Sequence, residues 1–238
     1  MLIDPYSLSS ELEQLEQIEK ASLRMIVQAI FDFRESAEEI FREESDLVAD
    51  IGEDITREAL DSMGMSRIDQ RLFGKMDYKQ ARYLFHPEYA VRQALFVDSK
   101  AEKSSGMKTA TLQTSQFSME VRQIRSGQSL QIPGTLPSVL SLRDEDYITT
   151  TVFVKYNYSE LTPKSYALDG VTIAALPNGL LQERYNPNAV DGIWLAGRNA
   201  PSRGEAFRVR LSFPKLKAKA SWRVQSIPIS AKIWHWTK

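Results

Sequence analysis

The chain has 238 residues, of which 42% are hydrophobic and 26% charged, with a formal net charge of -1 and no cysteine. The lack of cysteine excludes disulfides, thiolate metal sites and a cysteine nucleophile. With no apolar run long enough to span a membrane and no secretory signal at the start, these features predict a cytoplasmic protein whose residues 1–238 form a single domain.

Two helical patterns occupy the first quarter of the chain. Apolar residues recur every three or four positions from Leu12 to Phe33, which predicts one amphipathic helix. A second series runs from Ile40 to Met63 and predicts a second helix, which Gly64 is well placed to end. We therefore expect residues 7–64 to be the helical part of the domain.

The rest of the chain contains sequence patterns typical of β-strands. Short apolar or aromatic runs between Gly64 and Lys100, with a turn near His86, predict two or three strands. Residues 102–116 are polar and predict a loop or weak helix, and irregular structure is expected in residues 122–146. Further strands are expected in residues 147–158, 166–177 and 206–213. The predicted fold class is α/β (α+β): a central mixed sheet, mainly in residues 70–175, flanked by the N-terminal helices.

The stretch "LFVDSK", residues 95–100, is an apolar run that ends in an acid and an ammonium group. Because side chains on a strand alternate, Asp98 and Lys100 should point to the same face. If Asp77, in "GKMDYK", lies on an adjacent strand, the two carboxylates can converge at one end of the sheet. Such a pair would bind Mg²⁺ together with a substrate phosphate, and Lys100 would stabilise negative charge. This pattern predicts phosphodiester hydrolysis; the alternative is a surface ion pair at the end of a strand.

The charges are distributed unevenly along the chain. Residues 1–62 contain 17 acids and 5 Lys/Arg, whereas residues 203–238 contain 9 Lys/Arg and one acid. A basic end of this kind indicates contact with nucleic acid, although acidic helices that simply face solvent would give the same asymmetry. Within the basic part, Arg208 and Arg210 should share one face of a strand, where arginines can read guanine in the major groove.

A series of ordered sequence blocks carries a family resemblance. The blocks are "SLRMIVQAI", "EDITREAL", "DYKQARYL", "FVDSKAEK", "TLQTSQ", "VFVKYNYSEL", "RYNPN" and "PSRGEAFRVRLSF". In order and interval they resemble type II restriction endonucleases of the SfiI family, within the PD-(D/E)xK nuclease superfamily. Met76 stands where that motif usually has proline, residues 102–108 are longer here, and residues 122–135 diverge.

The resemblance implies a restriction-endonuclease-like core and a hydrolase that makes Mg²⁺-dependent double-strand cuts at a specific palindromic DNA site. It implies that Asp77 and Asp98 bind the metal and that Lys100 is the catalytic lysine. Glu53, in "EDIT", would be a further catalytic acid from the helix or simply an exposed helix acid. A homodimer or homotetramer is expected, together with a cognate DNA methyltransferase in the same system.

The resemblance also implies which residues contact DNA. Arg208 and Arg210 would read bases, with phosphate contact or solubility as the alternative, in a DNA-reading region formed by residues 180–238. Four further residues follow the strand that carries Asp98 and are expected to donate to bases or phosphates: Lys108, Thr109, Thr111 and Gln113. Arg203 is expected to contact the DNA backbone. Two other functions stay open: a structure-selective or repair nuclease of the same fold, and a catalytically inert DNA-binding protein.

Overall fold

The computed structural model describes residues 2–43, 48–64, 81–86, 89–104, 108–195 and 208–238; for residues 48–50, 81–86 and 208 it describes the backbone alone. The helices are α1 (Leu12–Asp32), α2 (Arg34–Glu43), α3 (Val48–Ser62), α4 (Gln182–Tyr185) and α5 (Phe213–Lys219). Short 3-10 helices occupy Pro5–Ser9, Thr114–Gln116, Gly179–Leu181 and Ser221–Arg223. None of the described helices is long and apolar enough to cross a membrane.

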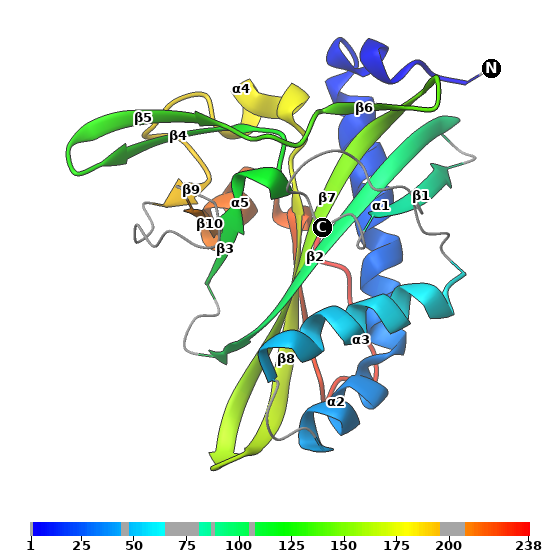
Figure 1. The fold of residues 1–238 in the computed structure, drawn as a ribbon, viewed down its shortest axis with the longest axis vertical. Helices are drawn as coiled ribbons and strands as arrows, with labels where there is room; N and C mark the ends of the chain where they lie inside the picture. Colours follow the sequence, from blue (N-terminus) through cyan, green and yellow to red (C-terminus); the bar gives the residue numbers. More distant parts are fainter. Residues whose placement is uncertain (1, 44–47, 65–80, 87–88, 105–107, 196–207) are drawn as a thin grey trace.

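A six-stranded sheet forms the centre of the molecule (Figure 1). Its strands are β1 (Ala81–His86), β2 (Val91–Lys103), β6 (Val139–Leu142), β7 (Glu145–Thr162), β8 (Ser165–Leu176) and β11 (Val224–Pro228). The order is β1-β2-β7-β8-β11, with β6 paired to part of β7. The β2–β7 pair is parallel and the other pairs are antiparallel, so the predicted mixed central sheet is confirmed.

Two smaller sheets accompany the central one. The first has the order β3-β10-β9 and consists of β3 (Thr109–Gln113), β9 (Trp194–Leu195) and β10 (Arg208–Ser212). The second is a hairpin of β4 (Glu120–Arg125) and β5 (Gln128–Pro133), which extends from one side of the molecule in Figure 1. The β3-β10-β9 sheet brings together segments about a hundred residues apart in the chain, which shapes the site described below.

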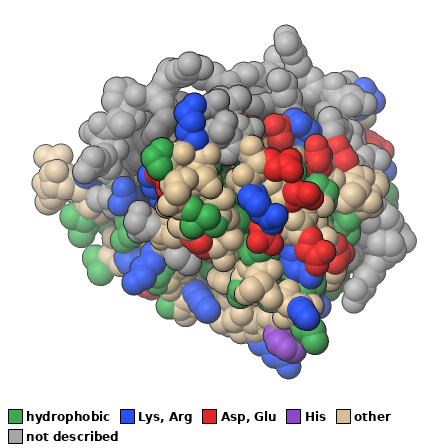
Figure 2. All heavy atoms as spheres, turned by 90° about the horizontal axis from the view of Figure 1, so that it is seen from below, with side chains coloured by type: hydrophobic (Ala, Val, Ile, Leu, Met, Phe, Trp, Pro, Cys, Tyr) green, Lys and Arg blue, Asp and Glu red, His purple; other side chains and the backbone are tan. Residues whose placement is uncertain are grey.

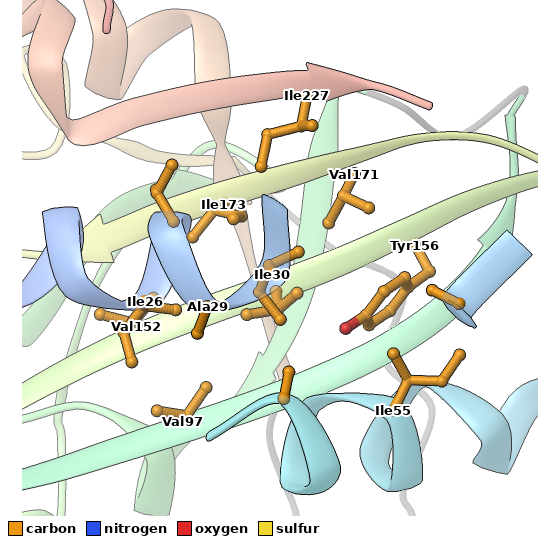
Figure 3. Close-up of a cluster of buried hydrophobic side chains, with 14 of the residues drawn as sticks. Ile26, Ala29, Ile30, Ile55, Val97, Val152, Tyr156, Val171, Ile173 and Ile227 are labelled. Atoms are coloured by element: carbon orange, nitrogen blue, oxygen red, sulfur yellow. The ribbon is translucent and has the colours of Figure 1, made fainter. Parts of the chain in front are cut away.

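The two faces of the central sheet bury different partners. On one face, α1, α2 and α3 enclose an apolar cluster; Figure 3 shows Ile26, Ile55, Val97, Val152 and Ile173 pointing toward one another there. The other face packs, through Phe153 and its neighbours, on a second cluster formed by the β3-β10-β9 sheet, α5 and the first turns of α1. The predicted packing of the N-terminal helices on the sheet is confirmed.

The helical region differs from the prediction in one respect. The first helix is found as predicted, but the second, predicted from Ile40 to Met63, is wrong in extent, because the structure has two separate helices, α2 and α3. The first of these, α2, begins at Arg34, directly after α1, and the Arg34 guanidinium donates 2.8 Å to the Phe31 carbonyl in the last turn of α1. Gly64 follows α3 with φ +72°, the left-handed conformation expected of a residue that ends a helix.

Two segments predicted as loops contain strands. The prediction for residues 102–116 is wrong in part, because β2 continues to Lys103 and β3 begins at Thr109. The strand β3 alternates buried and half-buried residues, and its backbone partner β10 is remote in sequence. Residues 122–146, predicted to be irregular, include most of the β4–β5 hairpin and the strand β6. The turn of the hairpin at Ser126 and Gly127, which have φ of 50° and 77°, has the backbone of a tight hairpin connection.

A glycine lets α3 approach β2 at backbone contact. A Cβ atom on Gly52 would lie 3.1 Å from the backbone nitrogen of Ala101, the carbonyl carbon of Lys100 and Cδ2 of Tyr156. The hydroxyl groups of Tyr156 and Thr56 of α3 form a hydrogen bond of 2.8 Å. Burial raises the pKa of Tyr156, so this hydroxyl keeps its proton. The helix therefore supports β2 directly behind Lys100.

Candidate active site and nucleic-acid interface

Asp98 and Lys100 project from the same face of β2. The residue between them, Ser99, points the other way and donates 2.8 Å to the Thr56 hydroxyl on α3. The alternation of the strand therefore directs Asp98 and Lys100 to the face opposite α3. Asp98 is 8% exposed, so its carboxylate lies almost entirely inside the protein surface.

The ammonium group of Lys100 is held at a defined place on this face. It donates 2.8 Å to the backbone carbonyl of Thr111 in β3 and lies 5.8 Å from the centroid of the Phe153 ring. Phe153 is the register partner of Asp98 across the β2–β7 pair. The ammonium group is thus next to the strand position that carries the Asp98 carboxylate.

Two of the predicted site residues, Asp77 and Arg203, lie outside the described residues. Among the residues that the structure does describe, no three His, Cys, Asp or Glu side chains gather as a metal-binding group. Asp98 is consequently the predicted metal ligand whose surroundings are known.

Glu53 is exposed on α3. That helix packs on the face of β2 opposite to Asp98 and Lys100, so the structure does not place Glu53 on the same face as these two residues. Its neighbour Asp54 is ion-paired with Arg57 at 2.5 Å on the same helix.

Sequence reasoning missed a second lysine on the Asp98 face. Lys155 on β7 is in register with Lys100, and its side chain is 0% exposed. Its ammonium group donates to the Glu102 carboxylate at 2.5 Å and to the Thr109 carbonyl at 2.7 Å. The available signal was a charged residue in the middle of the apolar run "VFVKYNY", because a buried lysine requires a partner.

The predicted DNA-binding residues come together along the β3–β10 pair. The register pairs Gln113 with Arg208 and Thr111 with Arg210. Residues on the alternate positions, Ala110 and Leu112 on β3 and Val209 and Leu211 on β10, are buried in the apolar cluster. Thr109 also belongs to the first set, opposite Ser212, and the exposed Lys108 precedes the strand. The structure thus brings five of the predicted residues to one face of two strands: Thr109, Thr111, Gln113, Arg208 and Arg210.

Gln113 has a structural task as well. Its side chain accepts from the backbone of Gln116, while its own backbone N–H donates 2.7 Å to Oε1 of Gln116. This reciprocal cap begins the short 3-10 helix Thr114–Gln116. The side-chain oxygen of Gln113 is therefore already engaged at the edge of the predicted DNA-binding face.

Acidic and basic side chains gather on different sides of the central sheet. Exposed acids such as Glu38, Glu39 and Glu58 lie on α2 and α3, whereas Lys108 and Arg210 belong to the side of β3 and β10. On the face drawn in Figure 2, acidic side chains form a group with a few Lys and Arg among them. A polyanion would be repelled from the acidic α2–α3 side.

Comparison with known proteins gives consistent matches along nearly the whole chain. A sequence model of the family described as "Type II restriction enzyme SfiI" matches residues 20–227. The type II restriction enzyme SfiI of Streptomyces fimbriatus is 35% identical over 234 residues, which cover 92% of this chain and 86% of that protein.

Solved structures show the same likeness. The crystal structure of tetrameric restriction endonuclease SfiI bound to cognate DNA superposes with a TM-score of 0.79 at 32% identity, over 95% of this chain and 88% of that one. The restriction endonuclease BglI, bound to its DNA recognition sequence, superposes with a TM-score of 0.77 over 95% of both chains. At 17% identity, the BglI match shows a shared fold.

Proposed function

The chain belongs to the SfiI family of type II restriction enzymes, which are site-specific deoxyribonucleases, and we propose that it makes Mg²⁺-dependent double-strand cuts at one palindromic DNA sequence. Family membership confirms the resemblance and the enzyme class predicted from the sequence. The observation that carries the finer proposal is the position of Asp98 and Lys100, on one face of β2 and beside the β3–β10 pair.

The residues present fit a magnesium site. Asp98 offers a carboxylate, the hard oxygen ligand that Mg²⁺ prefers, on the face of β2 that also carries Lys100, where a phosphate could supply further ligands. We assign Asp77 as the second carboxylate. Ala81, which pairs with Phe96, is only four positions from Asp77 in the chain, a covalent span of at most about 14 Å. A bound Mg²⁺ would act as a Lewis acid on the phosphate and lower the pKa of a bound water.

Lys100 would stabilise the charge that develops on the scissile phosphate. An ammonium group has three donors, and the Thr111 carbonyl takes one of them. The others can donate to a phosphate oxygen or to the attacking water without breaking that bond. The Thr111 contact would also keep the side chain extended toward DNA lying along β3 and β10.

Glu53 remains the proposed further acid of the site. Because α3 packs on the opposite face of β2, Glu53 would have to act around the strand edge or through water. Glu53→Gln should therefore slow cleavage about tenfold, or roughly 1.4 kcal/mol, which is less than loss of a direct metal ligand would cost. The measurement is single-turnover cleavage, with Glu58→Gln on the same helix as the control. Equal rates for the two variants would make Glu53 an ordinary surface acid.

For sequence recognition we propose that Arg208 and Arg210 read base edges from β10. Contacts to bases or phosphates nearby would come from Lys108, Thr109, Thr111 and Gln113, and Arg203 would contact the DNA backbone. Arg208 and Arg210 lie two positions apart on β10 and so belong to one face of the strand, from which both could reach one groove and donate bidentate pairs to guanine. In this proposal residues 180–238 form the DNA-reading region of a single nuclease domain of residues 1–238, and β3 with Lys108 adds contacts from outside that region.

Arg208→Ala should reduce discrimination at one base pair by about 1–3 kcal/mol, because the guanine that loses its bidentate partner is no longer distinguished. The measurement is cleavage of the recognition site and of all its single-base variants. Arg42→Ala, which removes an exposed arginine from α2, is the control. Weakening by the same factor on every sequence would instead identify Arg208 as a phosphate contact.

The proposal includes a symmetric assembly. A palindromic duplex presents the same site on each strand, so two copies of the active site related by a twofold axis are needed to cut both. We propose a homodimer at least, and a homotetramer by similarity to SfiI, whose crystal structure on DNA is tetrameric. A monomer on cognate DNA in sedimentation analysis would contradict this. A cognate DNA methyltransferase would protect the host genome, and an unmodified genome that tolerated the active enzyme would argue against it.

One experiment separates this function from its alternatives. Purified protein is incubated with Mg²⁺ and a long DNA of known sequence, and the ends are mapped. Site-specific cleavage gives discrete ends at one repeated sequence, whereas a structure-selective or repair nuclease gives ends at branches or scattered positions. Binding without cleavage at any Mg²⁺ concentration would leave a catalytically inert DNA-binding protein.

A further inference from the structure

We propose that Lys155 is a positioning residue for DNA cleavage: it holds β3, which carries proposed DNA contacts, in a fixed place against β2, which carries Asp98 and Lys100. This inference rests on the proposed function. It concerns a buried residue that neither binds the metal nor touches the DNA in that proposal.

Because Lys155 is buried, its ammonium group depends on partners within the protein. Its side chain is 0% exposed, and an ammonium group without water is costly unless it is paired and hydrogen-bonded. Glu102, on the proposed catalytic strand, provides the opposite charge, and the Thr109 carbonyl provides a second acceptor. Lys155 thus joins three segments, β7, β2 and β3, which are separate in the chain.

Lys155 and Lys100 act on β3 as a pair. They are register partners on parallel strands, and they donate to the carbonyls of Thr109 and Thr111, two positions apart on β3. The opposite edge of β3 pairs with β10, which carries Arg208 and Arg210. A shift of β3 imposed by DNA would therefore be transmitted through these two ammonium groups to the strand that bears Asp98.

The two lysines differ in what else they do. Lys100 is half-buried, and in the proposed mechanism its ammonium group also donates to the phosphate. Lys155 is buried, and its ammonium group donates to the Glu102 carboxylate. When Lys100 engages the phosphate, Lys155 keeps β3 in register with the catalytic strands. This makes correct recognition at β3 and β10 a condition for correct placement of the reacting groups.

The test compares Lys155→Met with Lys103→Met. Methionine is unbranched and nearly equal to lysine in volume, although one heavy atom shorter, and it removes the charge and the donors. Lys103 belongs to an ion pair with Glu160 that joins the same two strands at 2.7 Å but is exposed, so its loss should have little effect. Binding to cognate DNA is measured without Mg²⁺, and cleavage is measured at saturating enzyme on the cognate site and on a site with one altered base pair.

We expect Lys155→Met to bind cognate DNA as the unaltered enzyme does but to cleave it about tenfold more slowly, equivalent to roughly 1.4 kcal/mol. Cleavage of the altered site should fall less, so the ratio between the two rates should decrease. A purely structural role would lower the melting temperature and both rates by the same factor, which would leave the ratio unchanged and overturn the inference.

A second variant covers the case in which Lys155→Met does not fold. Glu102→Gln changes a residue that is 36% exposed, keeps an acceptor for Lys155 and removes its opposite charge. The same decrease in the ratio, with unaltered DNA binding, supports the inference, and an unchanged ratio overturns it. Failure of the unaltered enzyme to cut any DNA with Mg²⁺ would instead overturn the proposed function, and this inference with it.

Discussion

Asp98→Ala should abolish Mg²⁺-dependent cleavage and leave DNA binding intact. Asp98 is the described carboxylate assigned to the metal, and it is nearly buried on the face that also carries Lys100. A catalytic metal contributes several kcal/mol of transition-state stabilisation, so its loss should slow cleavage by about a thousandfold or more. Binding should persist, because removal of a negative charge near the phosphates does not weaken attraction to them.

The assay for this variant is single-turnover cleavage at saturating enzyme, with binding measured separately in the absence of Mg²⁺. Asp32→Ala removes an exposed aspartate from α1 that hydrogen-bonds to Gln28, and it serves as the matched control. Cleavage by Asp98→Ala at the rate of this control would refute the metal assignment. Loss of binding together with cleavage would indicate that Asp98 supports the fold instead.

Lys100→Met should slow cleavage by about a hundredfold to a thousandfold, the usual loss when one donor to the developing negative charge is removed. The methionine side chain can still extend past Phe153, so the fold should tolerate it. Because the Thr111 carbonyl also loses its donor, a modest decrease in melting temperature should accompany the kinetic effect.

Lys103→Met is the control for this variant too, since Lys103 lies on the same strand and is exposed. Both variants should bind the recognition site with similar affinity. If Lys100→Met instead weakens binding and leaves the rate at saturation unchanged, Lys100 contributes a ground-state phosphate contact and not transition-state stabilisation.

Local patterns predicted much of this fold. The helix α1 follows from the spacing of its apolar residues, and β7 and β8 follow from long runs of β-branched and aromatic residues. The alternation in "LFVDSK" correctly places Asp98 and Lys100 on one face. Each of these features is decided by residues close together in the chain, so a single sequence is enough to predict it.

The features that were missed depend on remote partners. The strand β3 has five residues and becomes a strand by pairing with β10, about a hundred residues later. Lys155 is buried in a polar network because Glu102 and Thr109 come from two other strands. A local pattern can indicate that Lys155 needs a partner, but it does not identify residues on other strands as that partner. The resemblance of "FVDSKAEK" to a nuclease family therefore predicted a role for Lys100 but none for Lys155, its register partner on β7.

Gly52 couples the position of α3 to the position of β2, the strand that bears Asp98 and Lys100. At Gly52 no side chain of α3 separates the helix from the backbone of Lys100 and Ala101, so this contact has no side-chain layer that could absorb a change in the position of the helix. A displacement of α3 would therefore move the strand that bears Asp98 and Lys100, and it would do so from the face opposite these two side chains.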